Sequence, residues 1–236
     1  MLRESRYNAP MRTEPLDPRF RLAAPDPDRD LPAIARIISA AFAGGGYVDE
    51  ILQTYIGNCH YDFPVSRLIW DGDRLAHHWG VWTYPMRLES LTLTVAGIGA
   101  VVTDEADRKH GLMRHAALAS FDAMDAAGYD LTVLRGRHYV KYGYARAWNY
   151  VPYRLKPDET PPVPVPALPL KAPYRRLETA DIPAMDALYN HHHAAFTGTA
   201  VRPTYRTRSS EEIGSQGWFD ESGELTGYVR ALLVLA

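Results

Sequence analysis

The sequence predicts an α/β fold: a mostly antiparallel sheet flanked by helices, followed by a shorter unit that begins in the same way. Three observations support this. The first hundred residues follow the order strand, helix, helix and three-stranded meander, judged by their apolar periodicity. A strand, a basic loop and a long amphipathic helix occupy residues 101–127. A similar strand–helix opening begins again at Tyr174, after a proline-rich stretch.

The composition is that of an ordinary globular protein. The chain has 236 residues, of which 46% are hydrophobic and 23% charged, and its formal net charge is −2. This balance argues against a dedicated nucleic-acid binder. No apolar run is long enough for a signal peptide or a membrane span. The single Cys59 excludes an intrachain disulfide, as is typical of a reducing compartment. From the charge, the lack of long apolar runs and the single cysteine together, we expect a cytoplasmic protein with neither nucleic acid nor membrane as a partner.

The main domain is predicted over residues 20–156, after a disordered tail at residues 1–19. Residues 20–23 form a short apolar strand, and Pro32 suits the first turn of a helix that ends at Gly44-Gly45-Gly46. A second, short helix is expected over residues 48–56, because apolar side chains recur there on one side.

From Arg67 onward the apolar period becomes that of strands. Residues 67–70 and the stretch from Leu75 flank an Asp-Gly-Asp turn and predict a hairpin. The alternation at Trp79, Val81 and Thr83 indicates a half-exposed strand, and residues 91–103 form the next strand. Gly97-Ile98-Gly99 within it suggests a bulge or a close backbone approach.

The remaining elements of the main domain follow in order. They are a polar loop at 104–110, a helix at 111–127, a buried strand at 131–134, one helical turn around Tyr139, and a strand at 144–155. Gly128 closes the helix at the position where a left-handed residue is needed.

Residues 157–173 contain closely spaced prolines and are predicted to be a semi-rigid linker. Residues 174–236 then form a partial second unit, with a strand at Tyr174, a helix from Ile182, and a hairpin from Trp218 through Leu235. Because the chain stops on an apolar strand, we expect this unit to be truncated.

Residues 101–114 carry the strongest chemical signal. The first N–H groups of a helix lack internal partners and attract anions. Arg108 and Lys109 add positive charge just before the helix, and Gly111 allows a close backbone approach. Together these features predict a pyrophosphate site, although a plain surface connection has the same pattern.

Two motifs resemble the GNAT acetyltransferase superfamily, and the resemblance covers Phe20 to Leu155. The run from Arg108 to Met113 resembles its R-x-x-G-x-G/A loop, and the run from Tyr139 to Tyr144 resembles its Y-x-x-F-G-F/Y segment. The implied fold is a mixed, twisted GNAT-like sheet. Met113 departs from the usual glycine or alanine and looks like the Eis-type (enhanced intracellular survival) branch, which has tandem acetyltransferase-like domains.

The resemblance implies an N-acetyltransferase that uses acetyl-CoA as co-substrate, without a metal. A primary amine of a small molecule or peptide would attack the thioester directly in a ternary complex. Tyr139 matches the general acid that protonates the leaving thiolate. The positions implied to contact acetyl-CoA are Val101, Val102, Thr103, Arg108, Lys109, Gly111, Leu112, Met113 and Arg114.

Several alternatives stay open at this point. A non-catalytic acyl-CoA-binding or scaffolding module would share the fold, and transfer from a charged tRNA is disfavoured by the lack of a basic face. His77, His78 and Glu89 are candidate bases. The aromatic residues Trp70, Trp79, Trp82 and Tyr84 form either an acceptor cleft or the core. Three consecutive histidines, His191 to His193, cannot converge on one metal ion. A homo-oligomer is also open, because the Eis-type branch assembles into rings.

Overall fold

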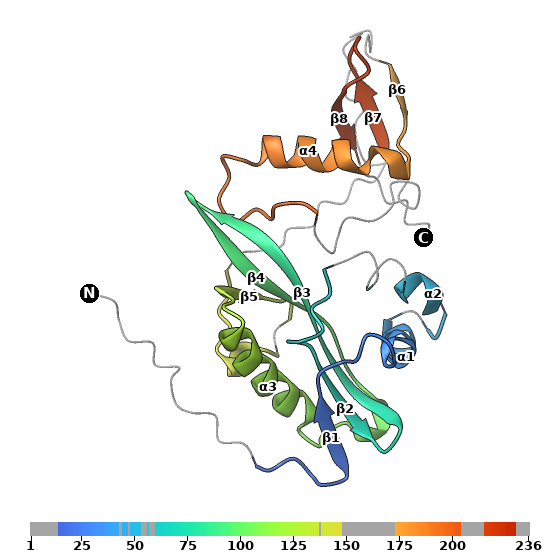
Figure 1. The fold of residues 1–236 in the computed structure, drawn as a ribbon, viewed down its shortest axis with the longest axis vertical. Helices are drawn as coiled ribbons and strands as arrows, with labels where there is room; N and C mark the ends of the chain where they lie inside the picture. Colours follow the sequence, from blue (N-terminus) through green and yellow to red (C-terminus); the bar gives the residue numbers. More distant parts are fainter. Residues whose placement is uncertain are drawn as a thin grey trace, which may run out of the picture.

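A computed structural model describes residues 14–42, 44–46, 48–52, 56, 60–136, 138–147, 173–203 and 215–229. It contains two separate sheets (Figure 1). The larger sheet has the order β1-β2-β3-β4-β5, in which the first three pairings are antiparallel and the last is parallel. Its strands are β1 (Phe20–Ala23), β2 (Arg67–Asp71), β3 (Arg74–Leu88), β4 (Leu91–Thr103) and β5 (Leu131–Val133). The predicted fold class, a mixed and mostly antiparallel sheet with helices, is confirmed.

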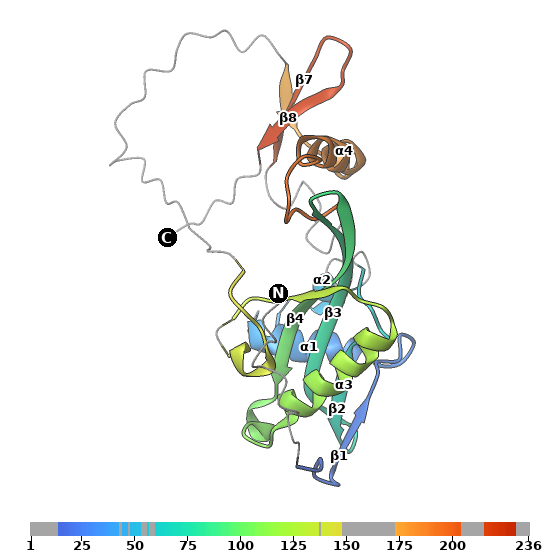
Figure 2. The same cartoon turned by 90° about the vertical axis from the view of Figure 1, so that its left-hand side faces the viewer.

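Helices cover both faces of this sheet. Helix α1 (Leu31–Phe42) lies on one face and α3 (Leu112–Ala126) on the other, as Figure 2 shows. Each helix buries an apolar stripe. The α1-side core includes Ile34, Ile38, Leu68 and Trp82. The α3-side core, in contrast, is built on residues such as Ile69, Trp79, Val81 and Ala116.

Strand β3 is buried on both faces along most of its length, so the prediction of a half-exposed strand is wrong. Every residue from Leu75 to Trp82 is buried. Alternating side chains enter the α1-side and α3-side cores in turn, because the two helices cover opposite faces. Trp79 and Trp82 are wholly buried and Trp70 nearly so, which places these three tryptophans in the core; Tyr84 is only partly buried.

The second unit repeats the opening of the first. Strand β6 (Tyr174–Arg176) leads through a 3-10 turn (Thr179–Asp181) into α4 (Ile182–His192), and the hairpin of β7 (Gln216–Phe219) and β8 (Leu225–Val229) follows. The sheet order is β6-β7-β8 and both pairings are antiparallel, as in β1-β2-β3. Each hairpin also has a register shift: at Ile69/Trp70 in the first, and at Trp218/Phe219 in the second.

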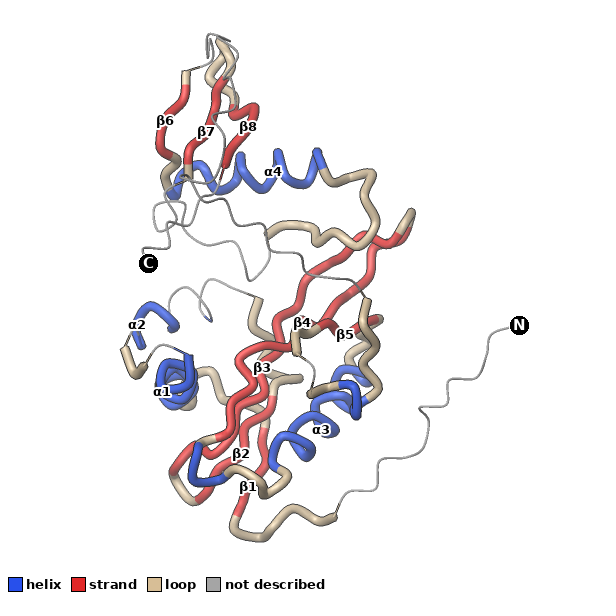
Figure 3. Tube along the Cα trace, turned by 180° about the vertical axis from the view of Figure 1, so that it is seen from behind, coloured by secondary structure: helices blue, strands red, loops and turns tan. Residues whose placement is uncertain are grey.

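The two units meet at the tip of the long β3–β4 hairpin, close to the loop that follows α4 (Figures 1 and 3). Met86 forms an antiparallel bridge with Ala200. The Arg87 N–H donates to the Thr199 carbonyl at 2.9 Å, and its carbonyl accepts from the Gly198 N–H at 2.7 Å. Its guanidinium donates to the Ala200 carbonyl at 3.0 Å. The loop therefore pairs, through main-chain hydrogen bonds, with the part of the β3 edge that β2 does not reach.

Some predicted elements differ from the structure. Helix α2 covers only Val48–Glu50, and Ile51, Leu52 and Ile56 have wider π-type turns, so the helix predicted for 48–56 is not a regular α-helix throughout. Residues 144–147, the start of a strand predicted for 144–155, have no regular structure: they follow a left-handed Gly143 and pair with no strand among the described residues, which do not include 148–155. Of the tail predicted for 1–19 and the linker predicted for 157–173, residues 1–13 and 157–172 lie outside the described residues, as do the last residues, 230–236.

Candidate functional site

The site begins where β4 and β5 part. The two strands pair only through Val95–Gly97 and Leu131–Val133. Beyond Gly97, no strand in the described part of the chain pairs with that edge of β4. An unpaired strand edge offers backbone donors and acceptors to an extended ligand, which can bind as another strand would.

A bulge interrupts β4 just past this point. Gly99 pairs with Gly80 and Val102 with His78, so Ala100 and Val101 together oppose the single residue Trp79. Ala100 has a φ of 46°, which is uncommon for a residue other than glycine. Bulges redirect backbone groups and gather near functional sites. The bulge suspected at Gly97–Gly99 from the sequence therefore lies immediately after those glycines.

The strand residues implied to contact acetyl-CoA all lie at the bulge or directly after it. Val101 packs against the α3-side core, and Val102 is buried in the α1-side core. The Thr103 hydroxyl lies 2.8 Å from His77 Nδ1. Since these side chains face the interior, only the backbone groups of these residues are available along the free edge of β4.

The basic loop follows β4 and leads into α3. Lys109 and Gly111 both have left-handed backbones, with φ of 71° and 72°. Gly111 is the N-cap of α3 and has no side-chain cap, so the first helical N–H groups, those of Leu112 and Met113, have no acceptor within the helix. A Cβ placed on Gly111 would meet no atom within 4 Å. The helix N-terminus is therefore open to an anion.

The side chains of the loop have different environments. Arg108 is 61% exposed and donates to the even more exposed Glu105 at 3.0 Å, an ion pair that contributes little in water and can exchange for a phosphate. Leu112 and Met113 pack in or against the α3-side core, so the larger residue at 113 points away from the loop. Arg114 lies partly buried in the first turn of α3.

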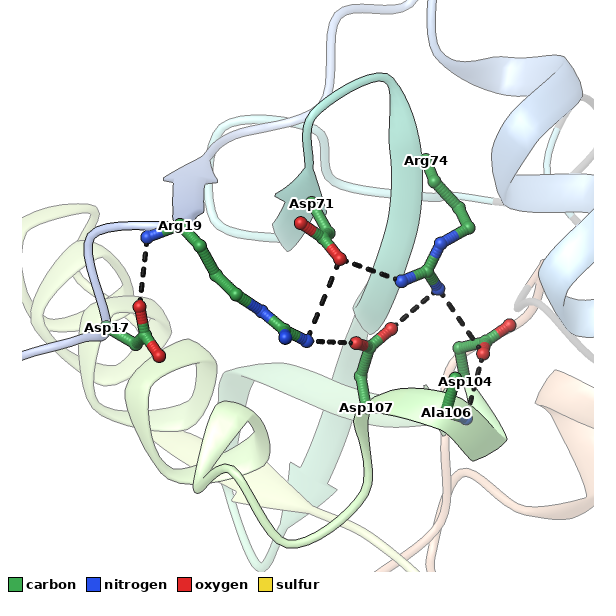
Figure 4. A network of polar contacts seen from close by, with 7 residues as sticks. All are labelled: Asp17, Arg19, Asp71, Arg74, Asp104, Ala106 and Asp107. Carbon is green, nitrogen blue, oxygen red and sulfur yellow. Dashed lines mark hydrogen bonds and ion pairs between the residues drawn. The ribbon is translucent and has the colours of Figure 1, made fainter.

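Beneath the loop lies a network of ion pairs that sequence reasoning missed (Figure 4). The Asp107 carboxylate is 1% exposed and accepts from Arg19 at 2.7 Å and from Arg74 at 2.6 Å. Arg74 also pairs with Asp71 at 2.9 Å and with Asp104 at 3.3 Å. The hydrogen bond from Arg74 lowers the pKa of Asp107, which stays charged. Because Asp107 directly precedes Arg108, the network fixes the loop to β1 and to the β2–β3 hairpin.

Tyr139 lies next to the bulge. Its ring packs edge-on against Trp79, the residue opposite the bulge, with 6.1 Å between ring centroids. It is half-buried, which raises the pKa of its hydroxyl, and this hydroxyl makes no hydrogen bond to a described residue. A Cβ on Gly136 would lie 2.8 Å from the Tyr139 ring, so the glycine allows the ring its position. Tyr142 and Tyr144 pack around it as partly buried aromatics.

None of the three candidate bases lies exposed beside the bulge. His77 and His78 are wholly buried, and burial lowers their pKa values to about 3 and about 4. Glu89 lies exposed in the turn between β3 and β4, at the junction with the second unit rather than at the bulge. In the described part of the chain, no group of three or more His, Cys, Asp or Glu side chains could hold a metal ion, and no helix is long and apolar enough to span a membrane.

Two solved structures resemble this chain over both units. A probable N-acyltransferase from Enterococcus faecalis V583, described as a conserved protein of unknown function, has 14% identity and a TM-score of 0.66, covering 89% of this chain and 54% of its own. A GCN5-related N-acetyltransferase from Kribbella flavida has 15% identity and a TM-score of 0.56, covering 84% and 52%. The chain thus spans about half the length of each. At such identities the likeness concerns the fold.

A GNAT acetyltransferase from Brucella melitensis, solved in complex with acetyl-CoA, aligns at 16% identity with a TM-score of 0.44 over 54% of this chain and 83% of its own. No curated protein matches the sequence. The family model for the acetyltransferase (GNAT) domain matches residues 27–147, more than half of the chain, from the loop before α1 through the segment that carries Tyr139. The chain therefore belongs to the GNAT acetyltransferase family.

Proposed function

We propose that this chain transfers an acetyl group from acetyl-CoA to a primary amine of a small molecule or peptide. The observation that carries the proposal is the common location of three features: the open N-terminus of α3, the free edge of β4 with its bulge, and the Tyr139 side chain. A helix N-terminus suits a pyrophosphate, and a free strand edge suits the amide groups of a pantetheine arm.

In this proposal the backbone N–H groups of Lys109, Gly111, Leu112 and Met113 bind the pyrophosphate, with Arg108 and Arg114 adding charge. The pantetheine arm runs along Val101–Thr103. A backbone N–H at the bulge donates to the thioester carbonyl and stabilises the oxyanion that forms during attack. The bulge supports this role, because it breaks the regular alternation by which successive N–H groups of a strand point to its two edges, and so can turn a further N–H toward the free edge.

The proposed reaction is direct. The neutral amine attacks the thioester carbon, and a C–N bond forms while the carbonyl oxygen becomes an oxyanion. The C–S bond then breaks, and the thiolate takes a proton from the Tyr139 hydroxyl. Burial supports Tyr139 as a proton donor, since its raised pKa keeps the phenol protonated at neutral pH. The attacking nitrogen releases one proton to solvent, and solvent returns a proton to the Tyr139 phenolate, so the acid is restored for the next turnover.

We also propose that the chain belongs to the Eis-type branch, with an acetyltransferase domain at 20–156, a linker at 157–173 and a partial second GNAT-like unit at 174–236. Two observations support this. The order β6-α4-β7-β8 repeats the order in which β1, α1, β2 and β3 occur, with the same antiparallel pairing. The core also accommodates the side chain of Met113.

The test is calorimetric titration with acetyl-CoA. Gly111→Trp should abolish binding, because a bulky side chain would fill the open space at the α3 N-terminus. Gly128→Trp is the matched control: Gly128 follows the other end of the same helix, has a φ of 75°, and likewise would present an added Cβ with no atom within 4 Å. Because both variants place a large residue at a left-handed position, a difference in binding between them reports blockage of the loop rather than backbone strain.

Micromolar binding by the wild type that survives Gly128→Trp and is lost in Gly111→Trp would support the proposal. Turnover with amines such as spermidine or kanamycin would then distinguish an enzyme from an acyl-CoA-binding scaffold. A folded wild-type protein that binds no acetyl-CoA would refute the catalytic function.

A further inference from the structure

His78 connects the interior of the sheet to the β4 bulge. It lies on β3, one residue before Trp79, and is wholly buried. Its Nδ1 lies 2.7 Å from the Ala100 carbonyl oxygen, and its Nε2 lies 2.9 Å from the Tyr61 hydroxyl. Both ring nitrogens therefore have a hydrogen-bond partner, and one of these partners is the bulge itself.

The chemistry of the partners determines where the protons lie. A carbonyl oxygen can only accept, so Nδ1 carries a hydrogen and donates it to Ala100. Burial lowers the pKa of His78 to about 4, so the ring is neutral at physiological pH and Nε2 accepts from Tyr61. Burial also raises the pKa of Tyr61, whose hydroxyl stays protonated. The tautomer of His78 is thus fixed over the neutral range.

The bulge needs such a partner. Ala100 has a φ of 46°, a conformation that is unfavourable for a residue with a Cβ. In a bulge, the extra residue loses its regular ladder partner, and a buried carbonyl without a donor is costly. The His78 N–H supplies a donor to the Ala100 carbonyl at this position, so the unusual backbone at Ala100 is stabilised from inside the sheet.

We propose that His78 is a positioning residue for acetyl transfer: by holding the Ala100 carbonyl, it orients the following N–H, that of Val101, toward the thioester. The peptide plane that contains the Ala100 carbonyl also contains the Val101 N–H, and the two groups point in opposite directions. A hydrogen bond to the carbonyl therefore sets the direction of the N–H. This inference rests on the proposed function, because the thioester is the group that the N–H would polarise.

The neighbouring His77 provides a matched control. It is equally buried, but its Nδ1 contacts the Thr103 hydroxyl at 2.8 Å rather than the bulge carbonyl. Among the described residues, its Nε2 has no hydrogen-bond partner. Removing this imidazole perturbs the same part of the core and leaves the Ala100 carbonyl bonded to His78.

The experiment uses acetyl-CoA labelled at its carbonyl carbon and observed by NMR when bound. In the wild type, the hydrogen bond should move the carbonyl resonance downfield. His78→Leu should return it toward the value for free acetyl-CoA, with a Kd within about threefold of wild type, since a single polarising contact is lost. His78→Asn, whose amide nitrogen can replace Nδ1, should restore the shift, and His77→Leu should leave it unchanged.

Hydrogen exchange of residues 98–104 gives a readout that needs no ligand. Exchange there should be faster in His78→Leu than in the wild type or in His77→Leu. Turnover by His78→Leu should fall about tenfold to a hundredfold, less than the loss of a whole oxyanion-hole donor. If His78→Leu does not fold, His78→Gln replaces it as the variant that lacks the Nδ1 donor. The longer glutamine side chain places its amide group near the position of Nε2 rather than that of Nδ1.

Two results would overturn the inference. One is an unchanged carbonyl resonance in a folded variant that lacks the Nδ1 donor, and the other is an equal change in His77→Leu. Failure of the proposed function has a different signature: no acetyl-CoA binding by the wild type. Exchange of residues 98–104 then decides alone whether His78 holds the bulge, and unchanged exchange would refute it.

Discussion

The guanidinium of Arg74, at the start of β3, donates to the carboxylate of Asp107, 33 residues later in the chain, across 2.6 Å. This contact joins the β2–β3 hairpin to the turn that leads into α3. Arg19 binds the same carboxylate from the residue before β1. His110, within the loop itself, also contacts the Phe20 ring with 5.8 Å between centroids. The loop proposed to bind pyrophosphate is thus held by contacts with distant segments of the first unit.

Asp107→Asn should weaken acetyl-CoA binding and lower stability. The substitution removes the charge that pairs with both guanidinium groups. We expect a loss of about 1–3 kcal/mol, the range for hydrogen bonds to charged groups, toward its lower end because both arginines are partly exposed. Urea unfolding measures the stability, and calorimetry should show an acetyl-CoA Kd raised about tenfold, equivalent to about 1.4 kcal/mol.

The control is Asp73→Asn, which removes an exposed acid from the nearby β2–β3 turn and should change neither quantity.

The contribution of Asp107 to stability should also depend on pH in a defined direction. Since the pKa of Asp107 is lowered on folding, its stabilisation is present above the unfolded pKa and is lost as the pH falls through the folded value. A difference between wild type and Asp107→Asn that grew in acid would contradict this assignment.

Tyr139→Phe should reduce kcat by on the order of 10²–10⁴-fold, the usual contribution of a general acid. Acetyl-CoA affinity should stay within about threefold, and stability within about 0.5 kcal/mol, because the hydroxyl makes no hydrogen bond to a described residue. Steady-state kinetics and calorimetry test these expectations together. Unchanged kcat in the variant would remove Tyr139 from the mechanism.

The pH profile offers a separate test of the same residue. Burial raises the pKa of Tyr139 above its ordinary value of 10.0, so the acid stays protonated throughout the accessible range. The rate should therefore rise with pH as the amine loses its proton, with no fall below pH ~10 that is due to this tyrosine. If the rate instead falls as the pH rises near neutrality, and this fall disappears in Tyr139→Phe, the pKa of Tyr139 is not raised.

Gly136→Ala should displace the Tyr139 ring. The new Cβ would lie 2.8 Å from it, at a φ of 150°, and overpacking of this kind costs about 1–3 kcal/mol. Gly143→Ala is the matched control, because Gly143 has a φ of 91° but an added Cβ there would meet no atom within 4 Å. Both variants should lose stability, whereas only Gly136→Ala should lower kcat strongly. Equal kcat values would show that the ring position is unimportant.

The buried pair His77 and His78 should make the protein sensitive to mild acid. Their folded pKa values are lowered to about 3 and about 4, so the unfolded chain binds protons that the folded chain does not. Stability is therefore complete above pH ~6.5 and falls below it, by about 1.4 kcal/mol per pH unit for each histidine. Urea midpoints at several pH values should show a shallower dependence in His77→Leu. His191→Gln, at an exposed position on α4, should not change the slope.

Local patterns make most elements of the first unit predictable. The apolar stripes of α1 and α3, the Asp-Gly-Asp turn and the left-handed Gly128 are short-range signals, and each element lies within a few residues of its predicted position. The basic loop is likewise recognisable because its cations, its glycine and the helix that follows are adjacent in sequence.

The features missed by sequence reasoning depend on contacts between distant residues. Asp107 is one of several acids in a polar loop, and nothing nearby in the sequence indicates that Arg19 and Arg74 enclose its carboxylate. The burial of β3 on both faces follows only from the placement of α1 and α3 on opposite sides of the sheet. The sequence makes His78 a candidate base, but its bond to Ala100 depends on a register shift that no local pattern reveals.

The junction at Arg87 has a consequence for the behaviour of the protein at high concentration. One edge of β3 pairs with β4. The other edge is covered along its length by β2, then by a bridge at Tyr61, and then by the 198–201 segment. An uncovered strand edge is a template for aggregation. The second unit thus protects the first from edge-to-edge association, whatever its own chemistry. Shortened forms that lack it should aggregate more readily, even though the residues around the bulge are all retained.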